Sequence, residues 1–117
     1  MATLGETKVA FAADPKELVI ADAENFAVRL TKKFEHIKIG GQQYWDFTTE
    51  KGRKYIKVIA DQYGQRSVYC FIRIEDGAIL MAASWKAPAK GVRAWLSEVL
   101  ANDLAGVDQY TGWLYRR

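Results

Sequence analysis

Two runs in which apolar and polar residues alternate, Arg53–Ala60 and Ser67–Ile74, constrain the fold of this sequence more than any other feature. Successive side chains of a strand point to opposite faces, so each run predicts a strand with one apolar face. That face comprises Ile56, Val58, Ala60, Val68, Cys70, Ile72 and Ile74. Asp76-Gly77 joins the second run to Ala78–Trp85, and Asp-Gly between β-rich runs is a strong hairpin signal. The sequence therefore predicts three consecutive antiparallel strands.

A long helix is predicted before these strands. Asp14 is a typical N-cap, Pro15 suits the first helical position, and Glu17 is placed to reach back to the cap. One apolar stripe follows at helical spacing, made of Val19, Ala23, Phe26, Leu30 and Phe34. In an alternative interpretation, Leu18–Ala21 is a strand and the helix begins at Asp22. A short strand is also expected before the helix, over Lys8–Ala12.

The remaining segments complete the predicted fold. We expect a strand over Gln42–Thr49 after the break at Gly40-Gly41, and a turn at Lys51-Gly52. A shorter amphipathic helix ending at Gly106 is indicated by Val92, Leu96, Val99 or Leu100, and Leu104. The aromatic tail Tyr110–Arg117 is a candidate for a last edge strand. The sequence thus predicts a single α+β domain over residues 1–117, an antiparallel sheet of about four strands with one long N-terminal helix and a shorter helix packed on one face.

Composition excludes several classes of site. One cysteine, Cys70, and one histidine, His36, among 117 residues exclude an internal disulfide and leave no Cys/His set for zinc. We expect His36 to cap the end of the long helix and Cys70 to be a core thiol. We therefore expect no metal, no cofactor and no enzymatic activity. Without a long apolar run or a signal-peptide pattern, the chain is expected to be cytoplasmic and not membrane-bound.

The positive charge is concentrated in the middle of the chain. Residues 1–50 hold six basic and eight acidic residues, a net charge of −2. Residues 94–117 hold two basic and three acidic residues, a net charge of −1. Residues 51–93 hold nine basic and three acidic residues, a net of +6. An acidic partner would therefore meet the middle segment first.

Aromatic and basic side chains alternate on the second face of the predicted strands. This face carries Tyr55, Lys57, Tyr69, Phe71 and Arg73. Rings and cations side by side on a strand are typical of a nucleic-acid platform, in which bases stack on the rings and phosphates contact Lys or Arg. The alternative interpretation is that the rings pack beneath a loop or a partner subunit.

The segment SWKAPAKGVRAW, Ser84 to Trp95, adds further cations beside this face. Pro88 and Gly91 hold it outside the strand ladder, so that Lys86, Lys90 and Arg93 project freely. Backbone amides over residues 89–92 would receive a phosphate if they begin a helix. In the alternative interpretation the segment is a structural corner, with its two tryptophans anchored in the core and its cations solvated.

Four stretches together resemble a known family. They are GRKYIKVI (Gly52 to Ile59), QRSVYCFI (Gln65 to Ile72), AASWKAPAKGVR (Ala82 to Arg93) and GWLYR (Gly112 to Arg116). The combination resembles small uncharacterised proteins of tailed bacteriophages and marine viral metagenomes. The resemblance implies a phage context, with the host cytoplasm as location, and no particular activity.

Two hypotheses follow. The first is a non-enzymatic module that binds single-stranded DNA or RNA through Tyr55, Lys57, Tyr69, Phe71, Arg73, Lys86, Lys90 and Arg93. The second is a structural or protein-interaction module, as a homo-oligomer with the aromatic face as interface, a virion component or a host-protein inhibitor.

Overall fold

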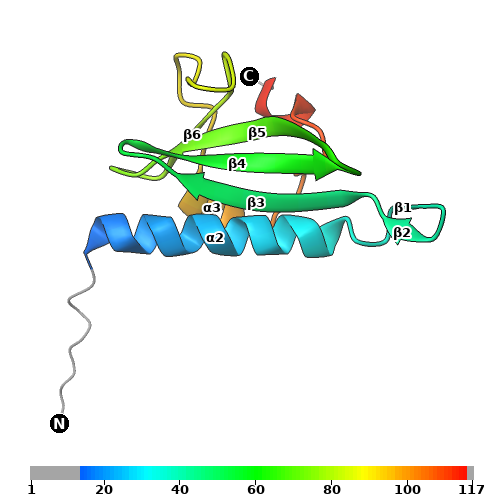
Figure 1. The fold of residues 1–117 in the computed structure, drawn as a ribbon. Helices are drawn as coiled ribbons and strands as arrows, with labels where there is room; N and C mark the ends of the chain where they lie inside the picture. Colours follow the sequence, from blue (N-terminus) through cyan, green and yellow to red (C-terminus); the bar gives the residue numbers. More distant parts are fainter. Residues whose placement is uncertain (1–13, 116–117) are drawn as a thin grey trace, which may run out of the picture.

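The computed structural model describes residues 14–115, so the candidate strand Lys8–Ala12 lies outside the described residues. The first half contains α2 (Pro15–Lys33), β1 (Lys38–Ile39), β2 (Gln42–Gln43), β3 (Trp45–Lys51) and β4 (Tyr55–Gln62). The second half contains β5 (Gln65–Arg73), β6 (Ala78–Leu80), β7 (Ala94–Trp95), α3 (Leu96–Ala101) and the 3-10 turn η1 (Gly112–Tyr115). Figure 1 shows α2 running along the sheet, with β1 and β2 beyond its end.

The start and the stripe of α2 confirm the prediction for this helix. The Asp14 side chain accepts a hydrogen bond from the Lys16 backbone N–H at 3.0 Å, and Pro15 is the first helical residue. The buried residues of the helix are Ala23, Phe26, Ala27 and Leu30. Residues 18–21 lie within the helix, so the alternative strand at this position is wrong.

The main sheet has five antiparallel strands in the order β3-β4-β5-β6-β7. The expected Gln42–Thr49 strand is divided between β2 and β3. Gly40 and Gly41 have φ angles of 59° and 80° and form the turn of the separate β1–β2 hairpin. The α+β class with an antiparallel sheet is therefore confirmed, and the sheet is larger than predicted.

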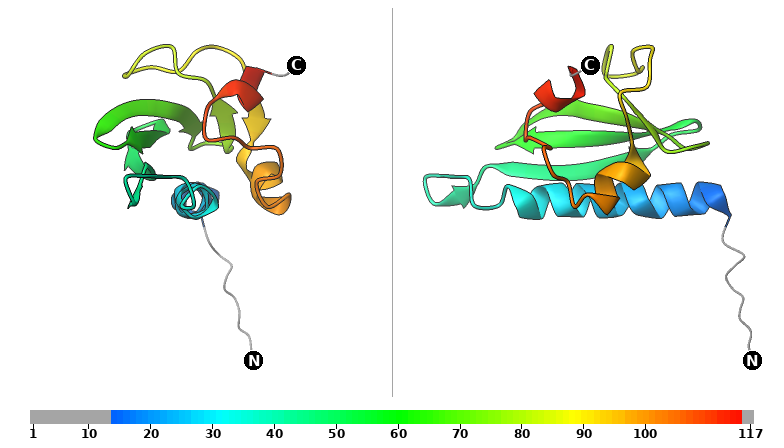
Figure 2. Two further views of the ribbon diagram at one scale, coloured as in Figure 1. Left: turned by 90° about the vertical axis from the view of Figure 1, so that its right-hand side faces the viewer. Right: turned by 180° about the vertical axis from the view of Figure 1, so that it is seen from behind.

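One face of the sheet carries the core. Figure 2 shows α2, α3 and the C-terminal segment on the same side of the curved sheet. The Lys33 ammonium fixes this C-terminal segment, because it donates to the carbonyls of Leu104 at 2.6 Å and Val107 at 2.9 Å. None of the helices within residues 14–115 combines the length and apolar character that a membrane crossing requires.

The predicted boundaries fail after residue 80. β6 ends at Leu80, five residues before the expected end of the strand, and the chain leaves the ladder as a loop bridged by Ala82 and Pro88. Residues 94–95 form β7 beside β6, so α3 begins only at Leu96. Asp103 and Leu104 have φ angles of 54° and 59° and prevent the helix from reaching Gly106. The tail forms η1 instead of an edge strand.

Candidate nucleic-acid interface

A β-bulge in β5 changes which residues share a face. Val58 pairs with Cys70 while Ile59 pairs with Val68, so Tyr69 has no partner in β4. An extra residue in one strand shifts the alternation of side chains by one position. Tyr69 consequently joins Cys70 on the core side, whereas a regular strand would place it on the opposite, outer face.

The Tyr69 side chain is a core group with its polar end satisfied. Its ring packs edge-on against Phe47, with centroids 5.2 Å apart, and it is 2% exposed. The hydroxyl donates to the Asp108 carbonyl and accepts from Trp113 Nε1 at 2.7 Å. Burial raises the pKa of this phenol above its usual value. The prediction that Tyr69 stacks a base is therefore wrong.

The outer face is covered by the chain itself. Ile59, Phe71 and Leu80 are buried there. Residues 81–93, called the 81–93 loop below, arch over this face in Figure 2. The interpretation that rings pack under a loop thus holds for Phe71, which is unavailable for base stacking. It is equally unavailable as an interface between two copies of the chain.

Two backbone amides near the C-terminal end of the 81–93 loop are also occupied. Ala89 N–H donates to the Met81 carbonyl at 2.8 Å, and Arg93 N–H donates to the Ile79 carbonyl at 2.8 Å. The expected phosphate site at the start of a helix over residues 89–92 is wrong, because the helix begins at Leu96. Trp85 and Trp95 are 41% and 39% exposed, so they are not the core anchors of the alternative interpretation either.

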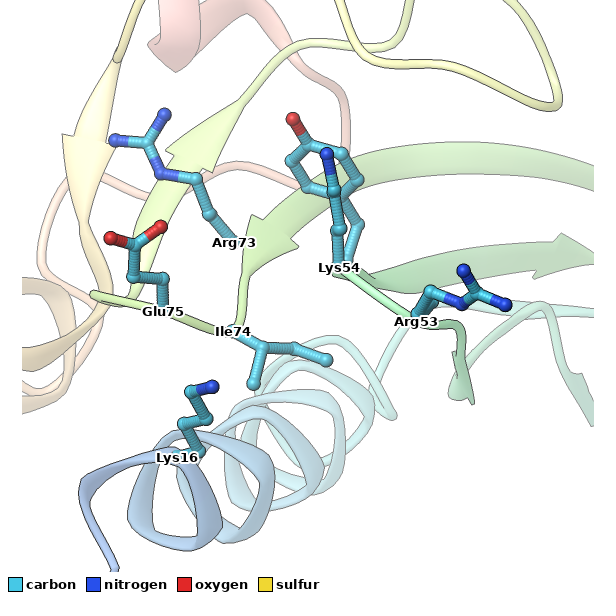
Figure 3. A pocket seen from close by; sticks show the side chains of 7 residues that line it. Lys16, Arg53, Lys54, Arg73, Ile74 and Glu75 are labelled. Atoms are coloured by element: carbon cyan, nitrogen blue, oxygen red, sulfur yellow. The ribbon is translucent and has the colours of Figure 1, made fainter.

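Two cavities lie on either side of Tyr55 at the end of the sheet where β3 turns into β4. The larger, of about 420 Å³, is lined by Lys16, Arg53, Lys54, Tyr55, Arg73, Ile74 and Glu75. Figure 3 shows Lys16 rising from α2 below Ile74, with Lys54 and Arg73 on opposite sides. The smaller, of about 240 Å³, is lined by Glu50, Lys51, Gly52, Arg53, Lys54, Tyr55, Lys57, Phe71 and Lys86.

The smaller cavity is strongly basic. Its five cations, which with Tyr55 are called the basic site below, are Lys51, Arg53, Lys54, Lys57 and Lys86. The one carboxylate among the described residues that line it, Glu50, is paired with Arg66 at 3.3 Å. The ion pairs formed among residues 14–115 involve Arg29, Arg66 and Arg73, so none engages a cation of the basic site. An anion entering this cavity would therefore meet uncompensated positive charge.

Backbone hydrogen bonds hold the turn that presents these cations. Gly52 N–H donates to the Tyr55 carbonyl at 2.8 Å, and Ile74 N–H donates to the Lys54 carbonyl at 2.9 Å. The turn is thereby bonded to the first residue of β4 and to the residue that follows β5. Lys51, Arg53 and Lys54 are not among the residues predicted from the sequence, although three cations within the four-residue run KGRK mark a basic turn.

The structure brings together only part of the predicted set. Tyr55, Lys57, Phe71 and Lys86 line the smaller cavity, and Arg73 lines the larger one. Arg73 is engaged by Asp76 through two hydrogen bonds, at 3.0 and 2.8 Å. Lys90 is exposed and lines neither cavity, and Arg93 lines a separate one with Trp95.

His36 and Cys70 have the structural surroundings that the sequence predicts for them. The His36 ring nitrogen Nδ1 lies 3.1 Å from the Lys33 carbonyl, just after the last residue of α2. Cys70 is fully buried, and burial raises the pKa of its thiol. Both predictions, a helix-end histidine and a core thiol, are confirmed.

Comparison with known proteins gives one match. The model of a family of unknown function, DUF7717, matches residues 7–116. No curated protein and no solved structure matches the chain.

Proposed function

Since the chain belongs to DUF7717, a family of unknown function, we propose its activity from its own surface: non-enzymatic binding of single-stranded nucleic acid at the basic site. One observation carries the proposal. Among residues 14–115, five cations line the smaller cavity, and the one carboxylate that lines it, Glu50, is paired with Arg66. Phosphate groups are the ligands that such a cluster recognises most simply.

The shape of the site suits a backbone that passes through it. Arg53, Lys54 and Tyr55 line both cavities, so the turn separates two adjoining hollows. Consecutive phosphates of a strand would contact Lys57 and Lys86 in the smaller cavity and Lys54 on the turn between the two cavities. Contacts of this kind fix the position of the strand without reading its sequence. Binding should therefore be tolerant of sequence and sensitive to salt.

The test is a titration of a labelled 12-nucleotide single strand at several salt concentrations. Each phosphate contact contributes about 0.7 to the slope of log affinity against log salt for a single strand. We expect the double variant Arg53→Ala with Lys54→Ala to lower the magnitude of that slope by about 1.4 and to weaken binding to DNA and RNA alike. Fluorescence anisotropy gives both quantities.

The matched control is Lys90→Ala, because Lys90 is an exposed lysine of the same basic segment that lies outside both cavities. We expect its slope to equal that of the unmodified protein. No binding at low salt would refute the proposed function. An equal loss in the Lys90→Ala variant would show that net charge, and not this site, attracts the strand.

A further inference from the structure

The 81–93 loop presents a tryptophan on a fixed turn. Ala83 and Ser84 N–H both donate to the Ala87 carbonyl, at 3.0 and 3.1 Å, and Lys86 N–H donates to Ser84 Oγ at 3.2 Å. These bonds close a tight turn with Trp85 inside it. The backbone that carries Trp85 is therefore held by the loop before any ligand arrives.

Two cations from the outer face of the sheet hold the Trp85 ring. Lys57 Nζ lies 4.4 Å and Arg66 Cζ lies 5.6 Å from the ring centroid. A cation near the face of an indole is attracted by the ring quadrupole, which orients the ring without enclosing it. Trp85 accordingly remains 41% exposed. It is a positioned aromatic surface and not part of the core.

Trp85 adjoins the basic site through two residues. Lys57, which lies against its ring, also lines the smaller cavity, and so does Lys86, the next residue in the chain. Tyr55 lines the same cavity, but the edge-to-face contact of its ring with Phe71 leaves it half-buried. Trp85 is thus the more exposed ring beside these cations.

We propose that Trp85 stacks an unpaired base and makes the site selective for single strands over duplexes. This inference rests on the proposed function. Every base has a flat π-face, so stacking on an indole tolerates any sequence. The bases of a duplex are already stacked on one another and cannot reach the ring. The cations alone would bind either form, because both present phosphates.

The experiment compares three 12-nucleotide probes: a single strand of deoxythymidine, an abasic strand of equal charge, and a duplex. We expect the unmodified protein to bind the deoxythymidine strand more tightly than the abasic strand. Trp85→Ala should weaken binding of the deoxythymidine strand by about 5- to 150-fold. It should leave the salt slope and the affinity for the abasic strand unchanged. Trp95→Ala is the matched control, since Trp95 is 39% exposed and lines a separate cavity.

Two further variants separate stacking from folding. Trp85→Leu keeps apolar bulk above Lys57 but has no ring, so it should lose affinity like Trp85→Ala, whereas Trp85→Phe should retain most of it. Circular dichroism establishes that each variant is folded. Unchanged deoxythymidine affinity in folded Trp85→Ala would overturn the role of Trp85 and leave the proposed function standing. Failure of the unmodified protein to bind any probe would overturn both.

Discussion

The Arg73–Asp76 pair is the best-formed ion pair among the described residues. Arg73 Nε and a terminal guanidinium nitrogen donate to the two carboxylate oxygens of Asp76, and Oδ1 also accepts from the Ala78 N–H at 3.1 Å. The hydrogen bond from Arg73 lowers the pKa of Asp76, and the same bond raises the pKa of Arg73. The pair therefore stabilises the turn between β5 and β6 in a pH-dependent way.

The sign of this dependence follows from the lowered pKa. A carboxyl group with a folded pKa below its unfolded value, about 3.9, adds stability that is complete above that value and is lost as the pH falls through the folded pKa. We expect Asp76→Asn to lower the free energy of unfolding at pH 7 and the difference to shrink below about pH 4. Urea unfolding of both proteins at pH 7, 5 and 3 measures this difference in the free energy of unfolding.

The control for this series is Glu24→Gln on the exposed side of α2. We expect its stability to follow that of the unmodified protein at every pH. A difference between Asp76→Asn and the unmodified protein that stays constant from pH 7 to pH 3 would contradict a role for the charge of Asp76.

The error at Tyr69 in the predicted site has a local structural cause, the bulge in β5. Residues 67–74 alternate without interruption, and nothing in that pattern marks an extra residue. The bulge turns the phenol toward the core, where it contacts Phe47 and has two hydrogen-bond partners, Asp108 and Trp113, from the C-terminal part of the chain. Partners so distant in sequence cannot be inferred from a local period.

Among the elements, the turn between β3 and β4 combines a close backbone contact with the basic site. A Cβ atom added at Gly52 would lie 3.1 Å from the Tyr55 carbonyl oxygen, to which Gly52 N–H is bonded. Relief of that contact requires the turn to shift, and Arg53 and Lys54 would shift with it. The turn therefore links local backbone geometry to the placement of charge.

We expect Gly52→Ala to reduce the free energy of unfolding by about 1 kcal/mol and to weaken binding of the 12-nucleotide strand. Gly112→Ala is the control, because no atom of the described residues beyond its chain neighbours lies within 4 Å of a Cβ at Gly112. Its effect on stability should stay within about 0.5 kcal/mol. Equal effects of the two substitutions would contradict a specific constraint at Gly52.

The elements also differ in how well the sequence predicts them. The helix α2 and the strands β4 and β5 are long, periodic and bounded by caps or turns, so their existence follows from local pattern. β6 and β7 are only three and two residues long; β6 pairs with β5 and β7 pairs with β6. Such short elements are defined by tertiary contact. The sequence pattern therefore does not separate them from the loop and the helix beside them.

At the scale of the whole molecule, burial of the outer face bears on its assembly. The second sequence hypothesis placed a subunit interface on the aromatic face, but Phe71 is buried on that face and Tyr69 on the core side. We therefore expect sedimentation equilibrium at micromolar concentration to give the mass of one chain. A stable dimer would contradict this expectation, and its disruption by Trp85→Ala would place the interface at the 81–93 loop.

The phage context implied by the sequence resemblance remains a prediction.

The basic site and the hydrophobic core are built from separate residues. Of the six residues that define the basic site, none belongs to the buried cluster that α2 forms with the sheet. The charge of the basic site can therefore change without a change in the packing of the core. Substitutions at the basic site are therefore expected to change the surface charge, and with it the proposed binding, before they change the fold.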